Sequence, residues 1–179
     1  MIIEDGNNYI VEVDNTRYIG PEAGGRFTER ADAEAFEAQL VEEKHTEEKD
    51  AALSDKLQTI EDYFLAKVNA DYPYDGHTYK ADYLQISGMS QNCMRLTDTD
   101  PIPSADGKWS TIELDGINPV RIAFTCAEFI QFAAAFAGRR AADFAVKQSH
   151  ETAVRGIHAD DAKTAQDILN YDHTTGGWV

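Results

Sequence analysis

The sequence predicts an α+β fold that is mainly helical, with short β-hairpins, a long N-terminal helical arm and a compact C-terminal helical domain. Residues 28–69 contain no Gly or Pro and are rich in Ala, Glu, Lys and Leu, which favours one long helix or two helices with a break between them. Elsewhere, short runs of apolar residues flank turn-forming pairs, a pattern typical of hairpins. Within 179 residues, we expect an N-terminal β-hairpin over 1–27, a helical arm or linker over 28–70 and a compact α+β domain over 71–179.

The chain is strongly acidic. It has 32 Asp and Glu against 16 Lys and Arg, a formal net charge of −16. Phosphate backbones and anionic lipid surfaces repel such a chain, so we expect neither nucleic acid nor a membrane as a partner. The hydrophobic content of 42% is enough for a core. We expect no signal peptide, because the N-terminus lacks a basic flank followed by an apolar run. We also expect no membrane-spanning segment, because the most apolar window, 122–137, is interrupted by Glu128 and Gln131.

The N-terminal part predicts a hairpin and then the long helix. Residues 9–13 and 16–19 have extended composition and flank Asp14 and Asn15, which form turns readily. If residues 28–69 form one continuous helix, its length of roughly 60 Å at about 1.5 Å per residue would make it project from a domain of this size.

One stripe of the long helix is the candidate interaction surface. It consists of Leu53, Leu57, Ile60 and Phe64, which recur at helical spacing. The repeat covers too few heptads for a clear coiled coil, so packing on its own domain is the favoured interpretation. If nothing in the chain covers the stripe, a second subunit is its natural cover.

The C-terminal domain is predicted from local signals. Thr125 and Glu128 form a capping box, with Phe124 and Phe129 as a hydrophobic staple, so a helix should begin at Cys126 and end near Gly156. Its apolar stripe is expected to pass through Phe129, Phe132, Ala133, Phe136, Ala137, Ala141, Phe144 and Ala145. We expect Trp178 to dock on this domain. The other predicted elements are a hairpin over 72–79, a helix over 81–96, a loop over 97–108, a hairpin over 109–124 and a helix over 160–169.

The sequence predicts no catalytic, cofactor-binding or metal-ligating set. Cys93 and Cys126 lack a metal-binding or redox spacing and are interpreted as buried reduced thiols. The acidic loop after Asp98 fails the spacing of a calcium loop, since Trp109 stands where the twelfth-position Glu is required. A small hydrolase remains a further hypothesis, using Asp or His residues within 98–106 or 150–161. Tyr72, Tyr74 and Tyr79 form a candidate sugar-binding platform, although core and hairpin packing is the commoner role of such residues.

Residues 62–179 resemble a known family. The matching features run in order from the Tyr74–Tyr79 hairpin, through Gln85-Ile86-Ser87 entering a helix and Trp109 ahead of Asp115-Gly116, to Thr125-Cys126-Ala127-Glu128-Phe129, the alanine-rich helix and the closing Gly177-Trp178. In this order and spacing the segment resembles the C-terminal domain of unknown function found in small proteins of tailed phages and prophages, associated with tail fibres.

This resemblance implies a non-enzymatic structural or assembly component of a bacteriophage or prophage tail or tail fibre. It implies other tail or tail-fibre proteins as partners, a homo-oligomer as the assembled state, no cofactor, and a location in the bacterial host cytoplasm during assembly or in the virion tail. The alternative is a carbohydrate-binding module of the tail apparatus.

Overall fold

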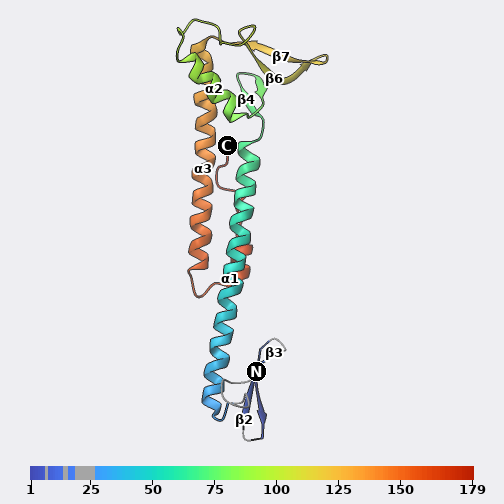
Figure 1. Cartoon of the computed structure of the whole chain (residues 1–179), viewed down its shortest axis with the longest axis vertical. Coiled ribbons are helices and arrows are strands. Elements are labelled where there is room, and N and C mark those ends of the chain that lie inside the picture. Colours follow the sequence, from blue (N-terminus) through green and yellow to red (C-terminus); the bar gives the residue numbers. More distant parts are fainter. Residues whose placement is uncertain (7, 14–15, 19–26) are drawn as a thin grey trace. The chain divides into compact units, whose positions relative to one another are not determined.

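In the computed structural model (Figure 1), the chain has the α+β fold that the sequence predicts. The structure describes residues 1–6, 8–13, 16–18 and 27–179. It divides into two compact units, Met1–Leu57 with Val154–Tyr171 (unit 1) and Gln58–Ala153 with Asp172–Val179 (unit 2). The elements in chain order are β1 (Ile2–Asp5), β2 (Asn8–Val13), β3 (Thr16–Tyr18), α1 (Arg30–Val68), β4 (Tyr72–Tyr74), β5 (His77–Tyr79), α2 (Tyr83–Cys93), β6 (Lys108–Asp115), β7 (Asn118–Ala123), α3 (Cys126–His158) and α4 (Ala165–Leu169).

The long helix is confirmed as one unbroken element, α1, of 39 residues and therefore about 58 Å in length. The division between the units falls inside α1, between Leu57 and Gln58, and not at the expected boundary at residue 70. The reason is that α1 contributes packed side chains to both units, so it is not a linker between separate domains. In the described part of the chain, none of the helices combines the length and the apolar character needed to cross a bilayer.

Unit 1 contains a three-stranded antiparallel sheet in the order β1-β2-β3. The sequence predicted the β2–β3 hairpin but missed β1, whose Ile3 pairs with Ile10 of β2. The predicted turn residues Asp14 and Asn15 lie outside the described residues. Val11 and Phe27 are buried with Ala33 at the start of α1, and the rings of Phe27 and Phe36 lie 5.2 Å apart.

Buried lysines tie α1 to the C-terminal part of unit 1. Lys49 Nζ donates to the Asp160 carbonyl at 3.0 Å, and Lys56 Nζ donates to the Tyr171 carbonyl at 2.9 Å. Both lysines are buried, so these charge-assisted hydrogen bonds replace the water that the ammonium groups lose.

Unit 2 is built around an aromatic core. Phe132 of α3 lies at its centre, with ring centroids 4.9 Å from Tyr79, 5.1 Å from Tyr74 and 5.3 Å from Phe129. The other buried members are Tyr72, Ile86, Cys93, Ile102, Phe124, Cys126 and Phe136. The core thus gathers residues from the β4–β5 hairpin, α2, the loop after it and α3.

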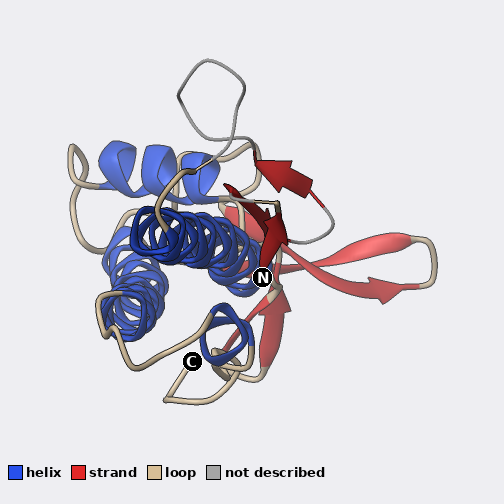
Figure 2. Ribbon diagram, turned by 90° about the horizontal axis from the view of Figure 1, so that it is seen from below, coloured by secondary structure: helices blue, strands red, loops and turns tan. Residues whose placement is uncertain are grey.

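Both predicted hairpins of unit 2 are confirmed as β4–β5 and β6–β7. The β6–β7 hairpin is held at its base, where Trp109 packs on Phe129 with ring centroids 4.9 Å apart. Farther along, Glu113 Oε1 accepts the Thr78 backbone N–H at 2.6 Å. Beyond these contacts the hairpin extends away from the helices of unit 2 in both views (Figures 1 and 2).

Helix α3 begins at Cys126, as predicted. The Thr125 N–H and hydroxyl both donate to Glu128 Oε2, at 2.8 and 2.9 Å, and the Glu128 N–H donates to Thr125 Oγ1 at 3.3 Å. Phe124 and Phe129 form the expected staple, with ring centroids 5.6 Å apart. The helix ends at His158, two residues beyond the predicted Gly156, and the last helix, α4, is shorter than predicted because it begins after the Thr164 cap.

The predicted stripe of α3 is wrong beyond Phe136. Ala137, Ala141 and Ala145 are exposed and Phe144 is 45% exposed, whereas Asp143 and His150 are buried. The buried positions are polar because the C-terminal segment of unit 2 supplies their hydrogen bonds. Asp143 Oδ1 accepts the Val179 N–H at 2.8 Å, and His150 Nε2 lies 3.0 Å from the Thr175 carbonyl.

Trp178 docks on unit 2, as predicted. Its indole stacks on His150, with ring centroids 5.5 Å apart, and meets the edge of Tyr63 at 5.2 Å. The indole N–H donates to the His173 carbonyl at 2.9 Å. Gly176 approaches His150 so closely that an added Cβ would lie 3.3 Å from the ring, which explains a glycine at this point of the segment.

We predict that Thr125→Ala lowers the free energy of unfolding by about 1 kcal/mol, because the first turn of α3 loses its cap. The measurement is urea denaturation at pH 7. Thr152→Ala is the matched control, since that hydroxyl lies within α3 and donates to the Gln148 carbonyl at 2.8 Å. The control should change stability by less than about 0.5 kcal/mol. Equal effects of the two substitutions would contradict the capping role.

The capping carboxylate also predicts a pH dependence. The hydrogen bonds from Thr125 hold the pKa of Glu128 below its ordinary value. The contribution of the Glu128 carboxylate to the free energy of unfolding is therefore complete above about pH 4.3, the ordinary pKa of Glu in an unfolded chain. This contribution is lost as the pH falls through the lower pKa of the folded state. The stability difference between the wild type and Glu128→Gln, measured by urea denaturation, should be largest near pH 7 and should shrink in acid. A constant difference across this range would contradict the assignment.

We predict that Trp178→Ala destabilises unit 2 by about 2–4 kcal/mol, since the half-buried indole bridges α1 and α3 within that unit. Thermal unfolding and amide hydrogen exchange of residues 172–179 measure the effect. Trp178→Phe, which keeps an aromatic ring beside His150, should retain most of the stability. Unchanged protection in Trp178→Ala would show that the segment is held without the indole.

Candidate functional site

One face of unit 2, formed by α2 and the first part of α3, has almost no charged side chains, and we call it the α2–α3 face. Helix α2 contains no Asp, Glu, Lys or Arg, and in the first part of α3, residues 126–138, Glu128 is the single charged residue. Charged residues make up 27% of the chain, whose net charge is −16. A half-exposed helix of this composition is unusual for a solvated surface, because exposed helix faces normally carry charge.

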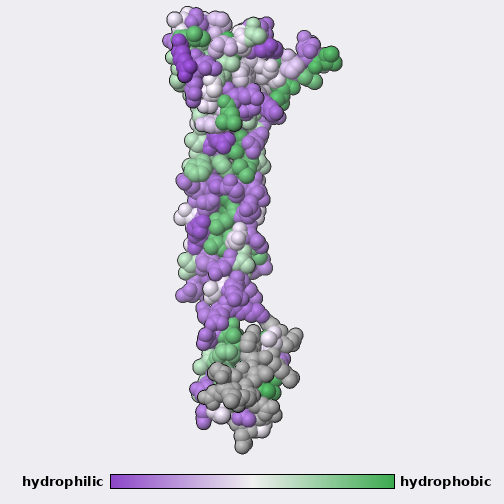
Figure 3. All heavy atoms as spheres, in the orientation of Figure 1, coloured by the Kyte–Doolittle hydropathy of each residue, from purple (hydrophilic) through white to green (hydrophobic). Residues whose placement is uncertain are grey.

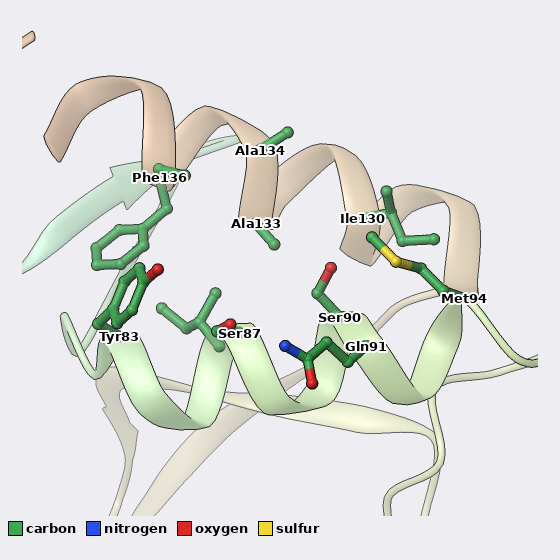
Figure 4. Close-up of a pocket in the computed structure, with 11 residues that line it drawn as sticks. Tyr83, Ser87, Ser90, Gln91, Met94, Ile130, Ala133, Ala134 and Phe136 are labelled. Atoms are coloured by element: carbon green, nitrogen blue, oxygen red, sulfur yellow. The ribbon is translucent and has the colours of Figure 1, made fainter. Parts of the chain in front are cut away.

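A groove of about 280 Å³ lies between α2 and α3 on this face. Figure 4 shows Tyr83, Ser87, Ser90 and Met94 rising from α2 toward α3, where Ala133 points into the space between the helices. Small side chains on α3 create the hollow, since a larger residue at these positions would fill it. The full lining is Tyr83, Ile86, Ser87, Ser90, Gln91, Met94, Ile130, Ala133, Ala134, Phe136 and Ala137.

The cap and the buried residues of α2 fix its orientation beside the groove. The Asp82 carboxylate caps α2 by accepting the Gln85 N–H at 3.0 Å. Ile86, Ser90 and Cys93 then form the buried side of α2, which fixes the opposite side of the helix toward solvent. On the exposed side of α2, Leu84 is 80% exposed, and Met94, which follows α2 and lines the groove, is 67% exposed. An exposed large apolar side chain in a groove favours an interaction surface.

An arginine flanks the groove at Tyr83. The Arg140 guanidinium lies 5.0 Å from the centre of the Tyr83 ring, a cation–π contact. The groove therefore has a mainly apolar, uncharged lining and a positive residue beside it, which suits an apolar segment bearing acidic residues.

Two thiols lie beneath this face. Cys93, at the end of α2, and Cys126, at the start of α3, are both buried and reduced, as expected from the sequence. Cys126 Sγ donates to the Pro101 carbonyl at 3.7 Å. Burial, reinforced by a hydrogen bond with the Cys126 thiol, raises the pKa of Cys93 to about 12. Cys93 is thus a packing residue with little thiolate at neutral pH.

The candidate interaction stripe on α1 is covered within the chain. Ile60 is fully buried and Phe64 is almost so, with the Phe64 ring centroid 6.0 Å from that of Phe144. Leu53 and Leu57 are half-buried. The expectation of an interaction surface at these four residues is therefore wrong at Ile60 and Phe64, because α1 packs on its own unit there.

The candidate sugar platform is also corrected by burial. Tyr79 is fully buried and Tyr72 is 7% exposed, both facing the aromatic core, whereas Tyr74 is half-buried. Burial raises the pKa of Tyr79 to about 12. The Tyr72 and Tyr79 rings are tilted against Phe132, with ring centroids 5.8 and 4.9 Å away, so these two rings do not present an open surface for a sugar.

The residues of the hydrolase hypothesis are engaged in local structure. In unit 2, Asp106 forms an ion pair with Arg121 at 2.9 Å, Asp100 accepts the Thr97 N–H at 3.0 Å, and His150 packs under Trp178. In unit 1, His158 Nε2 lies 2.7 Å from Asp50 Oδ1 at the edge of a hollow of about 630 Å³. Within the described ranges, no three His, Cys, Asp or Glu side chains are grouped closely enough to hold a metal ion.

Sequence reasoning predicted α2 but assigned it no function. The signal that could have identified this face is the run from Tyr83 to Met94 without a charged residue in so acidic a chain. The groove itself has no sequence signal, since it depends on how α2 packs against α3. Comparison of the chain with protein-family models, curated proteins and solved structures finds no match in any of the three.

We predict that both thiols of the native protein react with an aromatic disulfide reagent at pH 8 at least about a hundredfold more slowly than in the urea-unfolded chain, because both are buried and closed to the reagent. The release of the coloured thiolate product measures the rate. The unfolded protein should show two reactive thiols. Rapid native labelling of Cys93 would contradict the packing described above.

Proposed function

We propose that this chain is a non-enzymatic structural or assembly component of a tailed-phage or prophage tail or tail fibre, and that it acts by binding other proteins through the uncharged α2–α3 face. The observation that carries the proposal is this face, with its groove and exposed Leu84 and Met94, on a chain of net charge −16. The phage context comes from the resemblance of residues 62–179 to the phage-associated domain.

The composition of the face supports protein binding. The cores of protein–protein interfaces are depleted of charged residues, as α2 is. Small-molecule pockets commonly have about 300–1,000 Å³ and enclose most of their ligand. A groove of about 280 Å³ between two helices is better suited to side chains inserted by a protein partner.

The carbohydrate-binding alternative loses the observation that motivated it. It depended on exposed rings at Tyr72, Tyr74 and Tyr79, and two of these are buried. Two aromatic rings line the α2–α3 groove, but Phe136 is 3% exposed and Tyr83 is already covered on one side by Arg140. Protein binding is therefore the function that the geometry supports best.

The test is complementation of a phage or prophage from which the gene has been deleted. Ala137→Trp places an indole in the groove at an exposed position of α3 and should lower the yield of tailed particles by at least about tenfold. Electron microscopy counts particles with and without tails.

Ala141→Trp is the matched control, because Ala141 is also exposed on α3 but does not line the groove. It should complement like the wild type, and circular dichroism should show both variants folded. Normal tail assembly by the deletion strain, or full complementation by Ala137→Trp, would refute the proposal.

A further inference from the structure

The β6–β7 hairpin ends in an apolar tip. The strands pair up to Asp115 and Asn118, so Gly116 and Ile117 form a two-residue loop. Gly116 has φ +70°, which the tight turn requires. Ile117 is 91% exposed and the neighbouring Leu114 is 64% exposed. Figure 3 shows this hydrophobic tip on the hairpin.

The geometry of the turn does not require apolar residues at Leu114 and Ile117. Loop positions of two-residue hairpins usually hold Gly, Asn, Asp or Ser, and a β-branched apolar residue adds nothing to the turn. Nor does the core explain them, because Thr111 and Glu113 face inward while Ile112 and Leu114 alternate to the opposite, exposed face. An apolar tip on an acidic chain therefore points to a binding partner.

The tip is also held in place. The Trp109–Phe129 contact and the Glu113–Thr78 hydrogen bond fix the base of the hairpin on the core of unit 2. A hairpin anchored in this way presents Leu114 and Ile117 with little loss of conformational freedom on binding.

We propose that the tip of the β6–β7 hairpin, Leu114 and Ile117, docks in the α2–α3 groove of a second copy of this chain. The inference deepens the proposed function, on whose α2–α3 face it rests, by naming one partner of that face. Two apolar side chains match the size and the apolar lining of a groove of about 280 Å³.

Charge favours this pairing. The tip carries Asp115 beside Leu114, whereas Arg140 lies beside the groove, against the Tyr83 ring. Most surfaces of two chains with net charge −16 repel each other. The uncharged groove with Arg140 beside it is where an acidic, apolar-tipped segment of a second copy meets little repulsion.

The contact would be heterologous, since the tip and the groove are different surfaces of unit 2. The hairpin points away from α2 in both ribbon views (Figures 1 and 2), so the tip of one copy is directed to the groove of another and not to its own. Contacts of this kind generate rings or open chains of subunits.

The test is analytical ultracentrifugation of the full chain over about 1–200 μM. The wild type should show a mass that rises with concentration. Ile117→Asp, which removes the apolar tip, and Ala137→Trp, which occupies the groove, should each raise the dissociation constant by at least about tenfold. Asn118→Asp and Ala141→Trp are the matched controls and should associate like the wild type.

The decisive sample is a mixture of the two defective variants. Ile117→Asp retains an intact groove and Ala137→Trp an intact tip, so the mixture should form a 1:1 dimer and nothing larger. A monomeric wild type, wild-type association of either variant, or a mixture without a dimer would overturn the inference. If the inference fails while Ala137→Trp still blocks tail assembly, the proposed function stands and the groove binds a different tail protein.

Discussion

Unit 2 depends on the burial of one ring, that of Phe132. The rings of Tyr72, Tyr74, Tyr79, Phe124 and Phe129 all lie within 6 Å of it. These residues come from the β4–β5 hairpin and from the start of α3, so a single side chain joins segments that are distant in the sequence. Edge-to-face and tilted contacts of this type add about 0.5–1.5 kcal/mol each beyond the burial of apolar area. The positions of α2 and of the β6–β7 hairpin follow from this core.

Local signals explain what the sequence could predict. The cap formed by Thr125 and Glu128 involves residues three apart, so it can be inferred before any tertiary contact is known, and it placed the start of α3 correctly. The Asp-Gly pairs located both hairpins of unit 2 for the same reason. The absence of Gly and Pro from residues 28–69 predicted one long helix or two with a break, and the structure has a single helix, α1, through the charged stretch where a break was considered.

Contacts between distant segments explain what could not be predicted from the sequence. Asp143 and His150 would be costly to bury alone, and they lie on the buried side of α3 because Val179 and Thr175 satisfy them. A pattern of apolar residues therefore led to the wrong side of the helix beyond Phe136. Asp143 Oδ2 also has no hydrogen-bond partner among the described residues, a further departure from simple patterning. The prediction of a tyrosine platform was wrong at Tyr72 and Tyr79 for a related reason, because residue spacing does not show which face of a hairpin packs on the core.

Salt acts mainly on the charged surfaces of this protein and little on the α2–α3 face, which has almost no charge. At physiological ionic strength the Debye length is about 8 Å, so the long-range repulsion between two chains of net charge −16 is largely screened before their surfaces touch. An apolar groove holds few charges for the same ions to weaken. If two copies bind through tip and groove as proposed, their association should therefore strengthen as the salt concentration rises from dilute buffer toward physiological ionic strength.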